Sequence, residues 1–198
     1  MPFPRYTLLR RDVVFQGANR LETLQTRLET LASPPPAPRT REIYCCSPSV
    51  AVLPYDPRED LVALHEHFFP APLASGNEPW SLAACTGPLA FPAETPETAA
   101  RRLGHEHIGL VLTDLVLLMT LELAPENLAQ PWSVFLGRTV LPPTTGPIHV
   151  LTAAEAFAEL HAGRIKDAAT ALALQGLALH HADVRTRWLL SDVSTPLM

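Results

Sequence analysis

The sequence predicts an α/β protein, on three observations. Short apolar runs broken by Pro, Asp and Gly fill the middle of the chain and are typical of strands joined by turns. One stretch among them, ETPETAARRLGHEHIGL at residues 94–110, has the composition of a helix. After residue 152, Leu and Ala recur at helical spacing. The 198 residues fit one domain, or one domain with a small extension.

The composition excludes several classes of protein. Hydrophobic residues make up 47% of the chain, enough for a sizeable core. The net charge of −5, without a basic stripe, argues against a nucleic-acid partner. The most apolar run, Ile108–Leu121, contains Asp114 and is too short to span a membrane. Cys45, Cys46 and Cys85 are expected to be reduced, buried thiols of a cytoplasmic protein, since no signal peptide precedes them.

Residues 1–40 form the expected N-terminal extension. Tyr6–Leu9 and Asp12–Phe15 have strand character. Leucines spaced three and four residues apart over Leu21–Leu31 suggest a helix, but the same residues could form strands. The prolines of SPPPAPR at 33–39 predict a loop, because consecutive prolines can neither continue a helix nor pair in a sheet.

The remaining elements follow from turn and cap signals. A strand from the YCCSPSV segment leads through a Pro-Asp-Pro turn to a second strand, and three more strand candidates follow after a loop at 71–79. The strand candidates after the first are Leu61–His67, Trp80–Thr86, Leu112–Leu123 and Pro131–Leu141. The last two flank the loop Ala124–Gln130.

Two helices are expected at the C-terminal end. Thr152 is placed to cap Ala153–His161, with Gly163 just beyond its end, and Asp167 to cap a second helix that runs to about His181. Five apolar residues of this region are expected to be largely buried: Ile165, Ala169, Leu172, Leu174 and Leu177.

Residues 94–110 resemble the sequence box of the Nudix superfamily, G-x5-E-x7-R-E-x2-E-E-x-G followed by a hydrophobic residue. Five residues fall in step with that box: Glu94, Arg102, Glu106, Gly109 and Leu110. SVAVLPYDPREDLVAL at 49–64, EPWSL at 78–82 and AGRIKDAATALALQGLALHH at 162–181 resemble the ADP-ribose pyrophosphatase branch of that superfamily.

The resemblance covers roughly residues 40 to 182 and implies several properties. The fold would be a Nudix α/β/α sandwich with a mixed sheet over residues 41–198, and the N-terminal β extension would help to build a homodimer. The activity would be hydrolysis of a nucleoside diphosphate linked to another group, with Mg²⁺ or Mn²⁺ as cofactor. The partner would be a nucleoside diphosphate sugar or a related nucleotide, with no nucleic acid and no membrane.

The box departs from its family where metal is bound. In the family, two Glu four residues apart project from one helix face to the metal; here those positions hold Leu103 and His107. A leucine cannot bind a metal, and an imidazole suits Zn²⁺, Cu²⁺ or Ni²⁺ better than Mg²⁺. The late segment at 141–150, where the branch supplies a catalytic Glu, contains no carboxylate. Gly87 lies seven residues before Glu94, where the box has six.

If the protein is an enzyme, the resemblance points to Glu106 and Arg102 as catalytic residues, and to Glu94, Glu106 and His107 as metal ligands. A structural alternative is that Glu94 favours the start of the helix and that Arg102 pairs with Glu106 four residues later. Leu103 and Ala99 are then expected to form an apolar patch that packs against the sheet or against a loop that fills the former site.

His65 and His67 share one face of a strand. Together with residues of the box helix they could form a transition-metal site, although nothing in the sequence fixes a third ligand. The alternative is that they line the vacated cleft or are exposed. Phe68 and Trp80 are candidate substrate-binding residues, with core or interface packing as the alternative.

Two functions therefore remain open. The first is weak hydrolysis of a nucleoside diphosphate sugar with Mg²⁺ or Mn²⁺. The second is a non-catalytic nucleotide-binding or dimeric interaction module on a Nudix fold, which would need no cofactor.

Overall fold

The computed structural model describes residues 5–29, 36–90, 92–142 and 148–193. The chain divides into two compact units. The first comprises residues 1–48 and 122–131, and the second comprises residues 49–121 and 132–198. The expected role of residues 1–40 in dimerisation stays a prediction.

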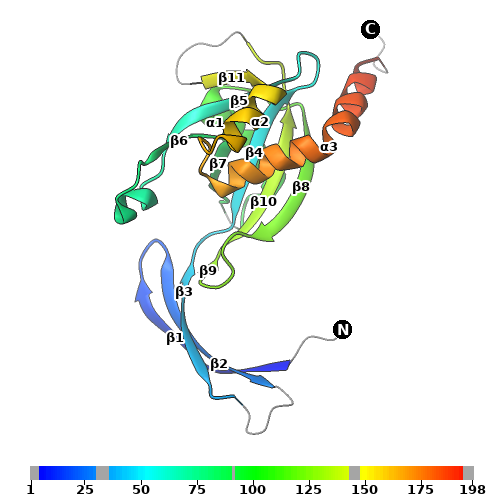
Figure 1. Ribbon diagram of the computed structural model, residues 1–198. Helices are drawn as coiled ribbons and strands as arrows, with labels where there is room; N and C mark the ends of the chain where they lie inside the picture. Colours follow the sequence, from blue (N-terminus) through cyan, green and yellow to red (C-terminus); the bar gives the residue numbers. More distant parts are fainter. Residues whose placement is uncertain (1–4, 30–35, 91, 143–147, 194–198) are drawn as a thin grey trace. The chain divides into compact units, whose positions relative to one another are not determined.

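The first unit is a four-stranded sheet in the order β1-β2-β3-β9 (Figure 1). Its strands are β1 Arg5–Gln16, β2 Arg20–Glu29, β3 Arg39–Cys45 and β9 Leu128–Ala129. β1 and β2 form an antiparallel hairpin, and β2 pairs with β3 on its other side. The helical interpretation of Leu21–Leu31 is thus wrong over Leu21–Glu29, where the strand alternative holds. Pairing on both sides satisfies the backbone of β2 and overrides the leucine spacing.

The second unit contains a mixed sheet in the order β11-β5-β4-β10-β8, with β6 paired to β5 and β7 paired to β4. Its strands are β4 Ser49–Asp56, β5 Leu61–Phe68, β6 Trp80–Ala83, β7 Cys85–Pro88, β8 Asp114–Glu122, β10 Pro131–Arg138 and β11 Ile148–Thr152. β4 is central and buried along its whole length, and it pairs in parallel with β10 and antiparallel with β5 and β7.

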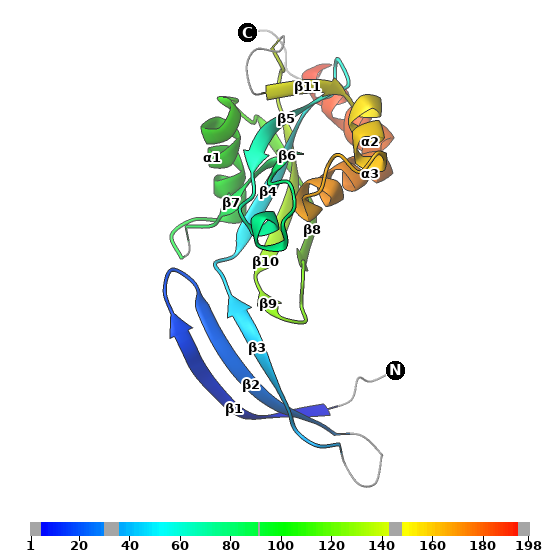
Figure 2. The ribbon, with the colours of Figure 1, turned by 60° about the vertical axis from the view of Figure 1, so that its left-hand side comes forward.

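Helices cover both faces of this sheet, as Figure 2 shows: α1 (Pro96–Ile108) lies on one face, and α2 (Ala153–His161) and α3 (Ala168–Val193) lie on the other. The side chains of alternate β4 residues lie on opposite faces of the sheet. Val50 and Val52 pack in the α1 cluster, whereas Ala51, Leu53 and Tyr55 pack in the cluster of α2 and α3. The expected α/β/α sandwich with a mixed sheet is confirmed.

The predicted caps are also observed. Thr152 forms a full capping box with Glu155 before α2, and Gly163 follows α2 with a φ of 71°. The Asp167 carboxylate accepts a 2.8 Å hydrogen bond from the Thr170 backbone N–H at the start of α3. α3 continues to Val193, well past the expected end at His181.

Some burial predictions need correction. Ile165, Ala169, Leu174 and Leu177 are buried as expected, but Leu172 is only half-buried because it lies at the margin of the α3 face that packs on the sheet. Cys45 and Cys46 are half-buried rather than buried, since they lie at and just beyond the end of β3. The loop expected at 71–79 contains a short 3₁₀ helix, η1 (Ala71–Ser75).

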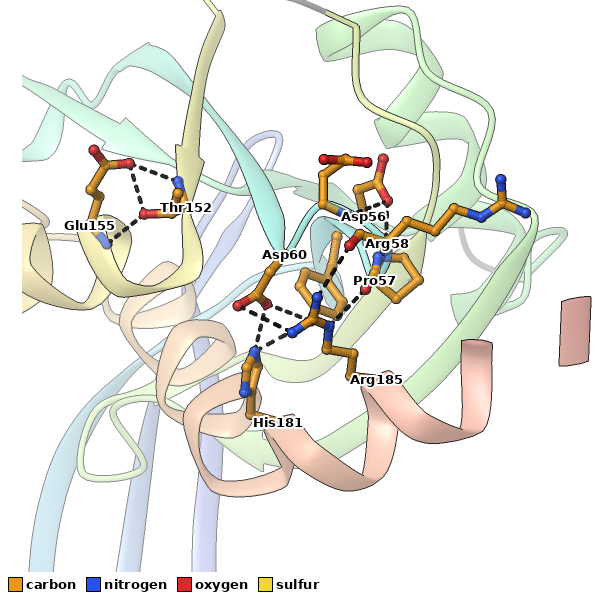
Figure 3. A network of polar contacts seen from close by, with 10 residues as sticks. Asp56, Pro57, Arg58, Asp60, Thr152, Glu155, His181 and Arg185 are labelled. Atoms are coloured by element: carbon orange, nitrogen blue, oxygen red, sulfur yellow. Dashed lines mark hydrogen bonds and ion pairs between the residues drawn. The ribbon is translucent and has the colours of Figure 1, made fainter. Parts of the chain in front are cut away.

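A polar network joins α3 to the turn between β4 and β5 (Figure 3). Asp60, with a φ of 59°, accepts hydrogen bonds from the Tyr55 hydroxyl at 2.7 Å and contacts His181 Nε2 at 2.6 Å. Arg185 donates to the carbonyls of Pro57 and Arg58 at 2.8 and 3.1 Å. The turn is therefore held to the helix by several independent polar contacts. Across the described ranges, no helix is both long and apolar enough to cross a membrane.

Candidate functional site

The candidate site is built on α1, which lies within the stretch 94–110 that has the composition of a helix. The Thr95 side chain accepts a hydrogen bond from the Thr98 backbone N–H, and Pro96 occupies the first turn, where its missing N–H costs nothing. Gly109 follows the helix with a φ of 69°, a conformation that favours glycine. These ends fix which side chains of α1 face the sheet.

Arg102 binds both acidic candidates. Its guanidinium donates to the two carboxylate oxygens of Glu94 at 2.8 and 2.9 Å and to Glu106 at 2.9 Å. It also donates to the Pro88 carbonyl at 3.1 Å. The Arg102 hydrogen bonds, aided by the Ala90 backbone N–H, lower the pKa of Glu94 to about 2. One cation therefore pairs with both carboxylates and ties the loop before α1 to the helix.

Leu103 lies against the sheet and is only 2% exposed. It belongs to the apolar cluster of Val50, Val52 and Cys85. A Cβ at Gly87 on β7 would lie 2.6 Å from a Leu103 methyl carbon, so a larger residue at this position would force the Leu103 side chain to shift. The expectation that Leu103 and Ala99 pack on the sheet is confirmed, because Ala99 is also fully buried.

His107, one turn beyond Leu103, faces two histidines of β5. His107 Nδ1 lies 3.2 Å from His65 Nε2, and His67 Nδ1 lies 3.2 Å from the same His65 atom. Burial, reinforced by the two neighbouring imidazoles, lowers the pKa of His65 to about 4. Burial and then His67 lower the pKa of His107. At neutral pH, His65 and His107 are therefore neutral, while His105 points to solvent.

The structure does not bring the three expected metal ligands together as one set. Within the described ranges, the His, Cys, Asp and Glu residues close enough to hold one ion are His65, Cys85 and His107. Glu94 and Glu106 are joined instead through Arg102. Their role as metal ligands, and that of Glu106 and Arg102 in catalysis, stays a prediction. Cys85 is the member that sequence reasoning missed, because no local motif links it to either histidine.

Phe68 and Trp80 lie opposite each other on β5 and β6, with ring centroids 5.3 Å apart in an edge-to-face arrangement. They are 43% and 54% exposed, so they do not pack in the core of the single chain. Their expected contact with substrate stays a prediction. Of the late segment 141–150, residues 143–147 lie outside the described residues.

Comparisons with known proteins fit this geometry. No protein-family model matches the chain. It is 24% identical over 192 residues to ADP-ribose pyrophosphatase of Escherichia coli K12, which covers 91% of each chain. It is also 24% identical over 198 residues to ADP-ribose pyrophosphatase of Haemophilus influenzae, covering 91% of this chain and 89% of that one. A crystal structure of an ADP compounds hydrolase matches with a TM-score of 0.69 and 18% identity, over 93% of this chain and 99% of that one.

The chain is a relative of the ADP-ribose pyrophosphatases of the Nudix superfamily. In Nudix terms, α1 is the box helix, and Leu103 and His107 occupy the positions of its metal-binding Glu pair.

The residues now at those positions do not fit magnesium. Mg²⁺ prefers an octahedron of oxygen ligands, whereas this helix face presents a methyl group and an imidazole nitrogen. The two carboxylates that remain in the box are held by one arginine. At these two positions α1 therefore offers no oxygen ligand.

Proposed function

We propose that this chain is an ADP-ribose pyrophosphatase-like protein whose hydrolysis of nucleoside diphosphate sugars with Mg²⁺ or Mn²⁺ is weak or lost. The observation that carries the proposal is the sheet-facing side of α1. Leu103 is buried there, and His107 contacts other imidazoles. A divalent ion held mainly by Glu106 would be poorly positioned, since Glu106 is exposed and paired with Arg102.

The expected loss of rate is large. A positioned metal neutralises phosphate charge and activates water, and each effect contributes several kcal/mol to a metal-assisted hydrolysis. A defect of about 4 kcal/mol slows a reaction roughly a thousandfold. The absence of a carboxylate from residues 141–150 removes the family's source of a general base as well.

The alternative, a nucleotide-binding module without catalysis, is favoured by a separate observation. Phe68 and Trp80 expose aromatic surface side by side on the second unit. Aromatic faces stack on nucleobases regardless of whether a bound nucleotide is later cleaved. The exposed Phe68 and Trp80 therefore support a protein that still binds a nucleotide but does not hydrolyse it.

The test measures turnover and binding separately. Hydrolysis of ADP-ribose with Mg²⁺ or Mn²⁺ is compared with that of an intact ADP-ribose pyrophosphatase under the same conditions, and we expect a deficit of about a thousandfold. ADP-ribose should nonetheless raise the melting temperature. Trp80→Ala should remove that shift, whereas Tyr44→Ala, an exposed aromatic of the other unit, should not. Turnover equal to that of the intact enzyme would contradict the proposal.

The homodimer and the cytoplasmic location belong to the same proposal. The three cysteines are free thiols, which suits a reducing compartment. The exposed apolar side chains of β1, Tyr6, Val14 and Phe15 among them, support the contact with a second copy.

A further inference from the structure

We propose that His65, Cys85 and His107 form a binding site for a zinc-class divalent cation, with His67 as the fourth donor. The site goes beyond the proposed nucleotide chemistry, and it would exist whether or not the chain hydrolyses a nucleotide. Its donors come from β5, β7 and α1, three elements of the same unit.

The spacing of the donors fits a tetrahedral metal. One nitrogen of each of His65 and His107 and the Cys85 sulfur lie within 4.8 Å of one another. The ring nitrogens of His67 and His107 both lie 3.2 Å from His65 Nε2. In a tetrahedron with Zn–N bonds of about 2.0–2.1 Å, two nitrogens are about 3.3 Å apart, which the His65–His107 and His65–His67 pairs match. The set of donors within 4.8 Å of one another is His65, Cys85 and His107, so His67 would have to turn toward the ion to become the fourth donor.

Hydrogen bonding alone does not satisfy this arrangement. His65 Nε2 faces two ring nitrogens but can carry only one proton or one lone pair. The two contacts therefore compete for that single proton or lone pair, and each is weaker than an unshared hydrogen bond. A cation between the three rings would accept a lone pair from each nitrogen and remove the conflict.

The environment of the other ring nitrogen of His65, Nδ1, is consistent with His65 acting as a metal ligand through Nε2. His65 is 8% exposed, and its Nδ1 forms no hydrogen bond of normal geometry with the described residues. The backbone of Ala83, its partner across β5 and β6, nevertheless interacts with the ring. With a metal on Nε2, the proton would lie on Nδ1 beside this backbone, which is the outer contact that metal-bound imidazoles generally make.

Cys85 selects the class of metal. Burial raises the pKa of its thiol to about 12, so the thiol alone stays protonated at neutral pH. A bound divalent ion would supply a positive charge: the thiol loses its proton to solvent, and the sulfur forms the metal bond. Imidazole and thiolate ligands suit Zn²⁺ and Co²⁺, whereas Mg²⁺ requires oxygen.

The test uses the full chain after removal of metal with a chelator. Zn²⁺ is titrated in competition with a chromogenic chelator, and Co²⁺ is titrated while the absorption spectrum is recorded. We expect one ion per chain, the visible bands of tetrahedral cobalt, a near-ultraviolet thiolate-to-cobalt band, and no displacement by millimolar Mg²⁺. Zn²⁺ should also raise the melting temperature, so the result does not depend on enzyme activity.

Variants assign the ligands. His65→Gln and His107→Gln should each lower zinc affinity about a hundredfold, and His67→Gln should lower it about tenfold. Cys85→Ser should remove the thiolate-to-cobalt band. The matched controls are His105→Gln, exposed on the same helix, and Cys46→Ser, a thiol of the other unit; both should bind like the parent. Circular dichroism verifies that each variant folds. If His65→Gln does not fold, the variants of His67 and His107, which are only half-buried, still test the ligands.

Several results would overturn the proposal. The first is the absence of stoichiometric zinc at micromolar protein. The second is an equal loss of affinity in His105→Gln. The third is displacement of the bound Zn²⁺ by Mg²⁺, or a zinc affinity that depends on Glu106 instead of the histidines. Unchanged affinity in His67→Gln would remove His67 as the fourth ligand.

Discussion

Leu103 is the residue that most clearly separates α1 from a magnesium-binding helix. It is buried to 2% exposure among Val50, Val52 and Cys85, and Gly87 leaves it room on β7. A side chain packed in this way contributes to the core of the second unit. The same position therefore has a structural role in this chain that a metal-binding Glu could not fill.

We expect Leu103→Ala to lower the free energy of unfolding by about 2–5 kcal/mol, because it removes buried methyl groups and leaves a cavity between α1 and the sheet. Urea denaturation measures this change. The control is Leu179→Ala, since Leu179 is 79% exposed on α3 and should change stability little. Equal effects of the two substitutions would contradict the packing.

The double substitution Leu103→Glu with His107→Glu tests whether metal binding can be restored. We expect the protein to be destabilised without metal, because a carboxylate replaces a buried leucine. Mn²⁺ should reverse part of that loss while turnover stays low. The uncharged pair Leu103→Gln with His107→Gln is the control, and Mn²⁺ should not stabilise it. Thermal melts with and without Mn²⁺ measure both variants.

The acidic residues of α1 illustrate what a sequence can predict at this scale. The Arg102–Glu106 pair follows from helical spacing alone, and the structure contains it. The approach of Cys85 to His65 and His107 does not follow from spacing, because the three residues lie on separate elements. Such a cluster depends on how β5, β7 and α1 are arranged around β4, which local patterns do not encode.

Among the elements, α3 packs closely enough to the sheet to tolerate only a small residue at Ala169, which is fully buried. Ala169→Leu should overpack this contact and cost about 1–3 kcal/mol. Ala178→Leu, at an exposed position of the same helix, should be close to neutral. If both variants melt like the parent, the contact is looser than the structure indicates.

The turn between β4 and β5 should make stability depend on pH. Burial acts to raise the pKa of Asp60, but hydrogen bonds with His181 and Tyr55 outweigh it and lower the pKa below the usual 3.8. A lowered pKa means that Asp60 stabilises the fold above about pH 4, and that this contribution is lost as the pH falls through the folded-state pKa.

Asp60→Asn should therefore cost about 1–2 kcal/mol at pH 7, with the difference from the parent narrowing toward pH 3. Asn tolerates the φ of 59°, so the substitution tests mainly the charge. Asp183→Asn, exposed on α3, is the control and should show no such trend. Urea denaturation at several pH values measures both variants; a constant difference would contradict the assignment.

The elements differ in how well their sequences predict them. The cap of α2 was predicted because Thr152 acts on its immediate neighbours. β2 was ambiguous because its leucine spacing also suits a helix, and the choice depends on pairing with β1 and β3. The sandwich itself was expected from resemblance, since periodicity does not specify which strands are neighbours.

For the whole molecule, β1 indicates a second copy of the chain. It is an edge strand of the first unit, and it exposes Tyr6, Val14 and Phe15 by 72%, 59% and 61%. An apolar edge of this kind is usually covered by another chain. We expect light scattering at micromolar concentration to report twice the chain mass of 21.6 kDa.

Deletion of residues 1–38 should give a monomer. Phe15→Lys should weaken the dimer, whereas Leu117→Lys, on an exposed position of β8, should leave it intact. A full-length protein that scatters only as a 21.6 kDa species would count against dimerisation.

The parallel pairing of β4 with β10 has a consequence for biosynthesis. Ser49 of β4 pairs with Trp132 of β10, so the central strand must wait for 83 further residues (132 − 49) before its neighbour leaves the ribosome. At about 5–20 residues per second this delay is roughly 4–17 s. The β1–β2 hairpin, whose partners are adjacent in the chain, can close within microseconds. The nascent chain therefore carries a finished hairpin and a β4 strand whose β10 side stays unpaired for seconds, the interval in which a chaperone that binds extended hydrophobic segments would have its greatest effect.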